Sequence, residues 1–152
     1  MKRSRFQPRR NRGKERPSQV FTFGPFAFQV DRAARLAANS KKYSPQLRRP
    51  SPEWVGPGIE INQDFVEQTD LEKPVIFATI ITEDDPWPVL IDGNHRELKA
   101  LRHQVSIPVI TLDLEDTLKV LTGPVAAIQR MKQVGQRLGL LGGGREGQLP
   151  RG

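Results

Sequence analysis

Five consecutive residues, Asp92-Gly93-Asn94-His95-Arg96, are the part of this sequence best suited to chemistry. They follow a short β-branched run and precede a segment of helical periodicity. The chain is therefore expected to turn at the glycine, between a strand and a helix. The first N–H groups of a helix lack intrahelical partners, and with the helix dipole they favour an anion. Arg96 would offer a phosphate a bidentate partner. The sequence therefore predicts a phosphate-binding turn made by Gly93, Asn94, His95 and Arg96.

The carboxylate of Asp92 stands one residue before the glycine, where it is placed to hold a divalent ion that bridges phosphates. A purely structural interpretation of the same residues stays open. Asn94 can cap the helix, with Glu97 three residues later in the position of a capping box. Arg96 could instead pair with Glu97 or with the acidic middle of the chain, and His95 could serve only in packing.

Charge is placed unevenly along the chain. The formal net charge is +7, and residues 1–20 hold eight basic side chains against one acid, so the whole excess belongs to this segment. Residues 1–19 lack apolar periodicity and are expected to be a disordered basic arm that binds DNA by counterion release, with a merely solubilising tail as the alternative. The arginines expected to contact DNA are Arg3, Arg5, Arg9, Arg10 and Arg12. Residues 53–92, by contrast, carry ten acids and one base, Lys73.

Composition excludes several kinds of site. The chain has no cysteine, which rules out disulfides, thiolate metal sites and cysteine nucleophiles. No apolar stretch approaches the roughly 20 residues of a membrane span, and no hydrophobic segment of signal-peptide type follows the basic N-terminus. These features predict a cytoplasmic protein that does not associate with a membrane.

The elements that precede the turn are read from aromatic and helical patterns. Residues 20–30 predict an extended segment broken at its Gly-Pro pair, whose four phenylalanines are expected to pack in or beside the core more than to stack on bases. Asp31 is expected to cap a helix over 32–39. Residues 44–58 are rich in Pro and Gly and predict a loop, with Trp54 expected as a plug at the edge of the core more than as a lid.

From residue 59 the pattern is clearer. Apolar β-branched runs at 75–81 and 89–91 predict strands that pair as a hairpin around a turn at 82–88, and 107–112 predicts another strand. Helices are expected over 64–71, from 94 onward, over 114–121 and over 124–141. Together these elements predict one α+β domain over residues 20–141, followed by a flexible Gly-rich tail at 142–152.

This order of strand, turn, helix and Ile-Pro-Val strand resembles the core of the ParB/sulfiredoxin superfamily. The residues that carry the resemblance are Pro88-Val89-Leu90-Ile91-Asp92-Gly93-Asn94-His95-Arg96, Leu98, Ala100, Leu101 and Ile107-Pro108-Val109. The resemblance covers about residues 59–121 and is strongest over 87–112. It implies a small mixed sheet with helices packed around it. In relatives with nucleotide bound, the turn and its arginine hold the triphosphate, which implies ATP or another NTP, with Mg²⁺, as the ligand here.

Carried over by position, the resemblance implies that His95 and Arg96 contact phosphates, helped by the backbone of Gly93 and Asn94. Asp92 would be the Mg²⁺ ligand or, with His95, a catalytic acid–base group. A kinase-like member also needs a carboxylate from an earlier segment. The candidates for it are Glu60, Asp64 and Glu67, and the sequence does not choose between them.

Two departures narrow the resemblance. Sulfiredoxins place a catalytic cysteine directly before the His-Arg pair, where this chain has Asn94, so sulfinic-acid repair is excluded. Chromosome-partition members carry a Glu-Arg-Arg form of the turn and a helix-turn-helix domain behind it, and the roughly 30 residues after the core are too few for that domain. The resemblance then points to small members: plasmid fertility-inhibition and oncogenic-suppression proteins, ParB-like nucleases and a free serine kinase.

Three functions follow as hypotheses. The first is a nucleotide-binding, Mg²⁺-dependent protein that acts on or beside DNA as an NTPase or nuclease, in plasmid maintenance or conjugation control. The second is a small-metabolite kinase. Its nucleotide turnover should be stimulated by amino acids or similar alcohols. The third is a non-catalytic interaction protein, such as an inhibitor with a protein partner, in which Asp92→Ala changes no rate.

Overall fold

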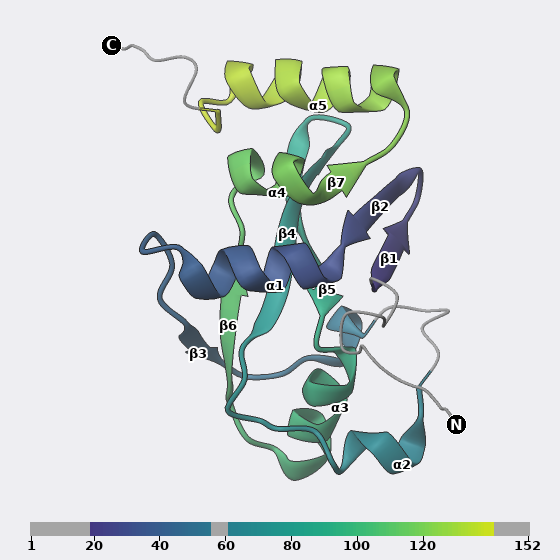
Figure 1. Ribbon diagram of the computed structural model, residues 1–152, viewed down its shortest axis with the longest axis vertical. Coiled ribbons are helices and arrows are strands. Elements are labelled where there is room, and N and C mark those ends of the chain that lie inside the picture. Colours follow the sequence, from purple (N-terminus) through teal and green to yellow (C-terminus); the bar gives the residue numbers. More distant parts are fainter. Residues whose placement is uncertain (1–18, 56–60, 142–152) are drawn as a thin grey trace, which may run out of the picture.

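The computed structural model describes residues 19–55 and 61–141, which form a mixed α+β structure with two small sheets and five α-helices (Figure 1). In chain order the elements are β1 Val20–Phe23, β2 Phe26–Gln29, α1 Val30–Asn39, β3 Gln46–Arg48, the 3-10 helix η1 Pro52–Trp54, α2 Gln63–Val66, β4 Val75–Thr82, β5 Asp85–Asp92, α3 Asn94–His103, β6 Ile107–Thr111, α4 Leu114–Val120, β7 Leu121–Thr122 and α5 Val125–Arg137. The basic arm with its five arginines and the tail at 142–152 lie outside the described residues. Gln19 is the one residue of the arm that is described.

The larger sheet has four strands in the order β3-β6-β4-β5 and is mixed, as predicted. Strands β4 and β5 form the expected antiparallel hairpin, and β6 runs parallel to β4. Parallel neighbours need a long crossover connection. Here that connection contains β5 and α3, which places the predicted turn at the end of β5 beside the start of β4.

The hairpin is longer than predicted. Strand β5 begins at Asp85, which pairs with Thr82, so only Glu83 and Asp84 form the turn that was expected at 82–88. The prolines of this segment suggested a turn. They are tolerated because β5 is an edge strand, where a missing N–H leaves no ladder bond unmade.

The smaller sheet has the order β1-β2-β7. Strands β1 and β2 form a hairpin around the predicted break, where Gly24 has a left-handed φ of 56°. Strand β7, Leu121–Thr122, was not expected, because Leu121 was assigned to the end of a helix. The predicted cap Asp31 is also wrong: Gln29 is the N-cap of α1, and the Asp31 carboxylate accepts a hydrogen bond from the Gln19 amide at 3.3 Å.

Three other predicted boundaries need correction. The loop at 44–58 contains β3 and η1, and the helix expected over 64–71 is reduced to α2. Helix α5 ends at Arg137 rather than at 141, because Gly139 adopts a left-handed φ of 76° that stops the helix. Trp54 is confirmed as a plug, since its ring packs edge-on against Phe77 with 5.0 Å between centroids.

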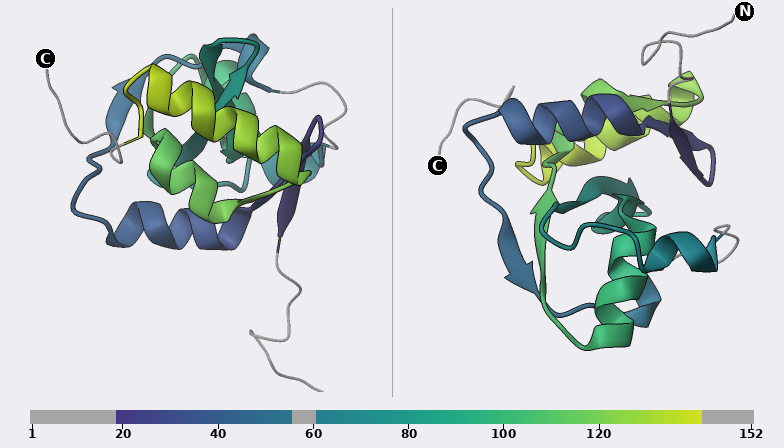
Figure 2. Two further views of the ribbon diagram at one scale, coloured as in Figure 1. Left: turned by 90° about the horizontal axis from the view of Figure 1, so that it is seen from above. Right: turned by 60° about the horizontal axis from the view of Figure 1, so that its bottom comes forward.

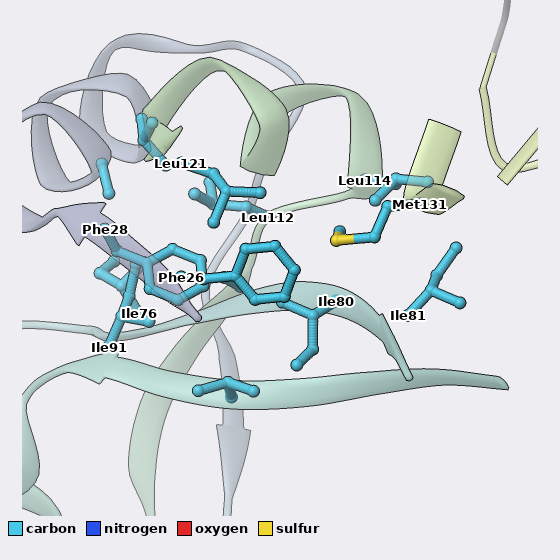
Figure 3. Packing of buried hydrophobic residues seen from close by; sticks show 14 of the residues in the cluster. Phe26, Phe28, Ile76, Ile80, Ile81, Ile91, Leu112, Leu114, Leu121 and Met131 are labelled. Atoms are coloured by element: carbon cyan, nitrogen blue, oxygen red, sulfur yellow. The ribbon is translucent and has the colours of Figure 1, made fainter. Parts of the chain in front are cut away.

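The larger sheet is covered on both faces. Figure 2 shows α1, α4 and α5 on one side of the strands and α2 and α3 on the other. The first face holds the main core, in which Phe26 and Phe28 pack with Ile76, Ile80 and Ile91 (Figure 3). The second face buries a smaller cluster that includes Val75, Phe77, Leu90 and Ala100. Within the described residues, no helix is long and apolar enough to cross a lipid bilayer.

Candidate anion site at the turn between β5 and α3

The turn is built around Gly93, the N-cap residue of α3. Its φ of 107° and ψ of 23° are left-handed, and its carbonyl accepts the Glu97 amide at 2.8 Å. A Cβ on this residue would lie 2.6 Å from Cγ1 of Val75 and 3.0 Å from Nη2 of Arg96. Glycine is therefore required here by backbone conformation and by the close approach of β4.

The predicted capping box is wrong. Asn94 is the first residue of α3 rather than its cap, and the helix start has no side-chain cap bond. Glu97 is completely buried, where its carboxylate accepts hydrogen bonds from Nη2 of Arg48 at 3.0 Å and from the Ser51 amide at 2.8 Å. Sequence spacing could not show these partners, which come from β3 and the segment after it. Among the described residues, the amides of Asn94, His95 and Arg96 donate to no acceptor.

The turn opens onto a cavity of about 600 Å³. All five residues of the turn line it. The opposite walls come from the start of β1 and from the segment between α2 and β4, which supply Phe21, Asp70 and Lys73. These wall residues were missed. The one available signal was Lys73, the single base among the acids of residues 53–92.

Arg96 is held partly by the fold and partly open to the cavity. Its side chain is 16% exposed, and its Nη2 donates to the Pro74 carbonyl at 3.1 Å and lies 3.5 Å from Oδ2 of Asp92. Arg96 thus pairs with Asp92 and not with Glu97. Its Nε is buried and has no partner among the described residues. Because buried donors are nearly always hydrogen-bonded in native proteins, this atom calls for a water or a ligand.

His95 is held by α2. Its Nε2 accepts the Asn62 amide at 3.2 Å, and its ring packs edge-on against Phe65 with 5.2 Å between centroids. A neutral imidazole that accepts through Nε2 carries its proton on Nδ1. His95 can therefore donate one hydrogen bond through Nδ1 without leaving its place in the fold.

The earlier carboxylates predicted for a kinase-like site do not gather at the turn. Glu60 lies outside the described residues, and Asp64, exposed on α2, does not line the cavity. Glu67 accepts from His103 at 2.8 Å at the far end of α3, and this bond lowers the pKa of the Glu67 carboxyl. Of the acids between α2 and β4, Asp70 lines the cavity.

The turn offers a divalent ion few protein ligands. Within the described residues, no three His, Asp or Glu side chains form a cluster that could hold a metal by themselves. Mg²⁺ needs only one or two protein oxygens when phosphates supply the others. Asp92 offers a carboxylate, and Oδ1 of Asn94 is buried without a partner among the described residues. Both atoms are of the kind that Mg²⁺ prefers.

A second polar cluster joins the segment after α1 to α4. The Asp116 carboxylate accepts from the Tyr43 hydroxyl at 2.6 Å and pairs with Lys42 and Lys119 at 3.0 Å each. The same hydroxyl accepts the Asp113 amide at 3.0 Å. Burial raises the pKa of Asp116, but the hydrogen bonds from Tyr43, Lys119 and Lys42 outweigh it and hold that pKa at about 2. Burial and the bond to Asp116 raise the pKa of Tyr43.

Comparison with models of known families, with curated proteins and with solved structures gives no match to this chain. The fold and the site define a mixed α+β protein in which an uncapped helix start adjoins one cavity with two basic and two acidic side chains in its lining: Arg96, Lys73, Asp70 and Asp92.

Proposed function

We propose that this chain is a nucleotide-binding, Mg²⁺-dependent protein of ParB/sulfiredoxin-like fold, whose turn after β5 holds the phosphates of ATP or another NTP. One observation carries the proposal: the amides of residues 94–96 have no described acceptor and adjoin a cavity that Arg96 and Lys73 also line. Uncapped amides at a helix start, the helix dipole and two cations all favour an anion. A phosphate also provides an acceptor for the orphaned Nε of Arg96.

Each residue of the turn has a role in this proposal. Arg96 and Lys73 neutralise the phosphate charge, and Nδ1 of His95 donates to a phosphate oxygen. Asp92 and Oδ1 of Asn94 would hold Mg²⁺, which supplies charge neutralisation between the phosphates. A cation such as Arg96 in the first turn of a helix costs about 0.3–1 kcal/mol. A bound phosphate would make this placement favourable.

The proposal extends to DNA. The basic arm, residues 1–19, would bind the phosphate backbone, so that the protein acts on or beside DNA in the cytoplasm, as an NTPase or nuclease in plasmid maintenance or conjugation control. The support is the charge of the chain, since the whole excess of +7 lies within residues 1–20. Such binding should weaken steeply as salt rises.

The test of the nucleotide site is a thermal-shift series with ATP, ADP, CTP and GTP, each with and without Mg²⁺. A ligand at 100 times its Kd should stabilise the protein by about 2.7 kcal/mol. Lys73→Ala should weaken binding about tenfold, because one charge-assisted bond is lost. Lys132→Ala, which removes an exposed lysine on α5, is the matched control and should change nothing.

Arg96→Gln is the second variant of this test. Because Arg96 also contacts Pro74 and Asp92 within the fold, its substitution can affect folding as well as binding. Its folding is checked by circular dichroism before any titration. Absence of a shift with all four nucleotides would end the proposal. So would a shift that both Lys73→Ala and a folded Arg96→Gln leave intact.

The DNA part has its own test. The full chain and a chain lacking residues 1–19 are titrated with mixed-sequence DNA at 50 mM and 200 mM salt. Neutralising six or more phosphates should cost the full chain about a thousandfold in affinity over this range. Equal binding by the shortened chain would show that the arm is not the DNA contact.

A second candidate is a non-catalytic protein that uses nucleotide only as a bound ligand. The two proposed catalytic groups already have partners within the fold, since Asp92 is paired with Arg96 and His95 accepts the Asn62 amide. Groups held in this way serve the structure, which favours binding without catalysis. Single-turnover assays separate the two candidates. Nucleotide hydrolysis lost in Asp92→Asn supports catalysis, whereas binding with no hydrolysis above buffer supports the second candidate.

A further inference from the structure

A groove of about 480 Å³ runs along the outer edge of β5 and is walled by aromatic rings. Phe21 and Phe23 of β1, Trp54 of η1 and Trp87 of β5 all line it, and Glu53 adds a carboxylate. Trp87 is 55% exposed and Phe23 43% exposed. Exposed aromatic side chains gathered in one concave place indicate a binding site more often than a structural one. We call this feature the edge groove.

The four phenylalanines of residues 20–30 differ in how deeply they are buried. Phe26 and Phe28 are buried in the main core (Figure 3). Phe21 packs against this core, with 6.4 Å between its ring centroid and that of Phe28, and it also lines the edge groove with Phe23. The core therefore accounts for Phe26 and Phe28 and partly for Phe21, and it leaves Phe23, which is 43% exposed, outside it.

The edge groove and the cavity at the turn share a wall residue. Phe21 lines both, and β1 lies beside the end of β5 (Figure 1). Along β5, Ile91 and Asp92 line the cavity, and the residues from Leu90 back to Trp87 line the groove. Strand residues advance about 3.3 Å each. A ligand with phosphates at the turn would thus extend along β5 toward the aromatic walls, with Phe21 shared by both hollows and Trp87 about 17 Å from Asp92 along the strand.

We propose that the edge groove binds the base of the nucleotide whose phosphates lie at the turn, an inference that rests on the proposed function. Aromatic side chains stack on flat heterocycles and do so with any base. Glu53 makes no ion pair or hydrogen bond with the described residues, and its carboxylate can accept from the amino group of adenine, cytosine or guanine. The groove therefore selects a base with an exocyclic amino group over uracil.

An added protein strand fits the edge groove poorly. Strand addition needs backbone N–H groups along an exposed edge. Two of the β5 residues at this edge, Pro86 and Pro88, have no N–H to donate. A flat ring needs none of these donors, so the chemistry of the edge favours a stacked ligand.

The two tryptophans of the chain make the test direct. The sequence contains only Trp54 and Trp87, and both line the edge groove, so tryptophan emission reports on this site alone. The full chain is titrated with Mg²⁺-ATP, Mg²⁺-UTP and Mg²⁺-tripolyphosphate, with binding followed by calorimetry and by emission. ATP should bind at least tenfold more tightly than tripolyphosphate and quench the emission, whereas tripolyphosphate should bind without quenching. UTP should fall between them.

Trp87→Ala should weaken ATP binding about tenfold and leave the affinity for tripolyphosphate unchanged. Trp87→Phe, which keeps a ring, should restore most of the ATP affinity. Leu47→Ala, at another exposed apolar position (75% exposed, on β3), is the matched control.

The possible failures are distinguishable. If ATP and tripolyphosphate bind equally and emission is constant, the base does not use the edge groove, although the phosphate site stands. The same conclusion follows if Trp87→Ala weakens both ligands alike. If neither ligand binds, the proposed function itself fails and this inference with it.

Discussion

Two polar clusters of this molecule contain similar groups and differ in how those groups are satisfied. Around Asp116, a tyrosine and two lysines donate to one carboxylate, and the cluster fastens the segment after α1 to α4. At the turn before α3, Arg96 pairs with Asp92 at 3.5 Å, yet Nε of Arg96 and Oδ1 of Asn94 have no described partner. Buried polar groups that only stabilise a fold are paired. The unpaired groups are therefore the ones to assign to a ligand.

Gly93→Ala should have the largest effect on this comparison. The residue has a φ of 107°, and a new Cβ would meet Cγ1 of Val75 at 2.6 Å. Backbone strain and overpacking together should lower the free energy of unfolding by about 3 kcal/mol, measured by urea denaturation. The matched control is Gly24→Ala, also left-handed at 56° but with nothing within 4 Å, which should cost about 1 kcal/mol. Equal losses of unfolding free energy in the two variants would mean that the contact with Val75 of β4 adds no steric cost at the turn.

Asp116→Asn should come next. It keeps the shape of the side chain and removes the charge that Tyr43, Lys42 and Lys119 share, at a cost of about 2 kcal/mol near pH 7. Glu115→Gln, one residue earlier on α4 and exposed, should have almost no effect. A small loss at Asp116 would show that this cluster is no better satisfied than the turn.

The same cluster should give the protein a pH dependence at low pH. The pKa of Asp116 is about 2 in the folded protein against 3.8 for a free side chain. A depressed pKa contributes stability that is full above the unfolded value and is lost as pH falls through the folded value. The stability difference between wild type and Asp116→Asn should therefore shrink between about pH 4 and pH 2. A difference that stays constant over this range would contradict the assignment.

Asn94→Ala should have the smallest effect and the opposite sign. It removes a buried oxygen that has no described partner and places a better helix former in α3. The free energy of unfolding should rise by about 1 kcal/mol, while Mg²⁺-dependent nucleotide binding weakens. Gln133→Ala, an exposed amide within α5, controls for helix propensity and should gain a few tenths of a kcal/mol. A loss of stability in Asn94→Ala would place this turn with the satisfied cluster.

The parts of the fold that the sequence predicted are local ones. The β4–β5 hairpin, the helix after Gly93 and the strand at Ile107–Thr111 each depend on patterns within a few residues. Strands β3 and β7 could not be predicted, because they are short and pair with segments far along the chain. Prolines also concealed the first half of β5, since nothing local shows that it is an edge strand.

The candidate site divides in the same way. Its turn was read from five adjacent residues, all of which line the cavity. Its walls at Phe21 and Lys73 were missed because only the tertiary structure brings them to the turn. Glu97 shows the same limit: local spacing suggested a cap, but its partner Arg48 lies 49 residues away.

The pairing of β2 with β7 has a consequence for how the molecule folds. Ala27 and Thr122 are partners separated by 95 residues, whereas the β4–β5 hairpin closes over a turn of two. Distant pairings carry a larger entropic cost of loop closure and form late. Strand β1 is held through β2, so we expect the wall that Phe21 provides to be completed in the last step of folding. Recovery of ligand binding during refolding should then lag behind recovery of helical signal.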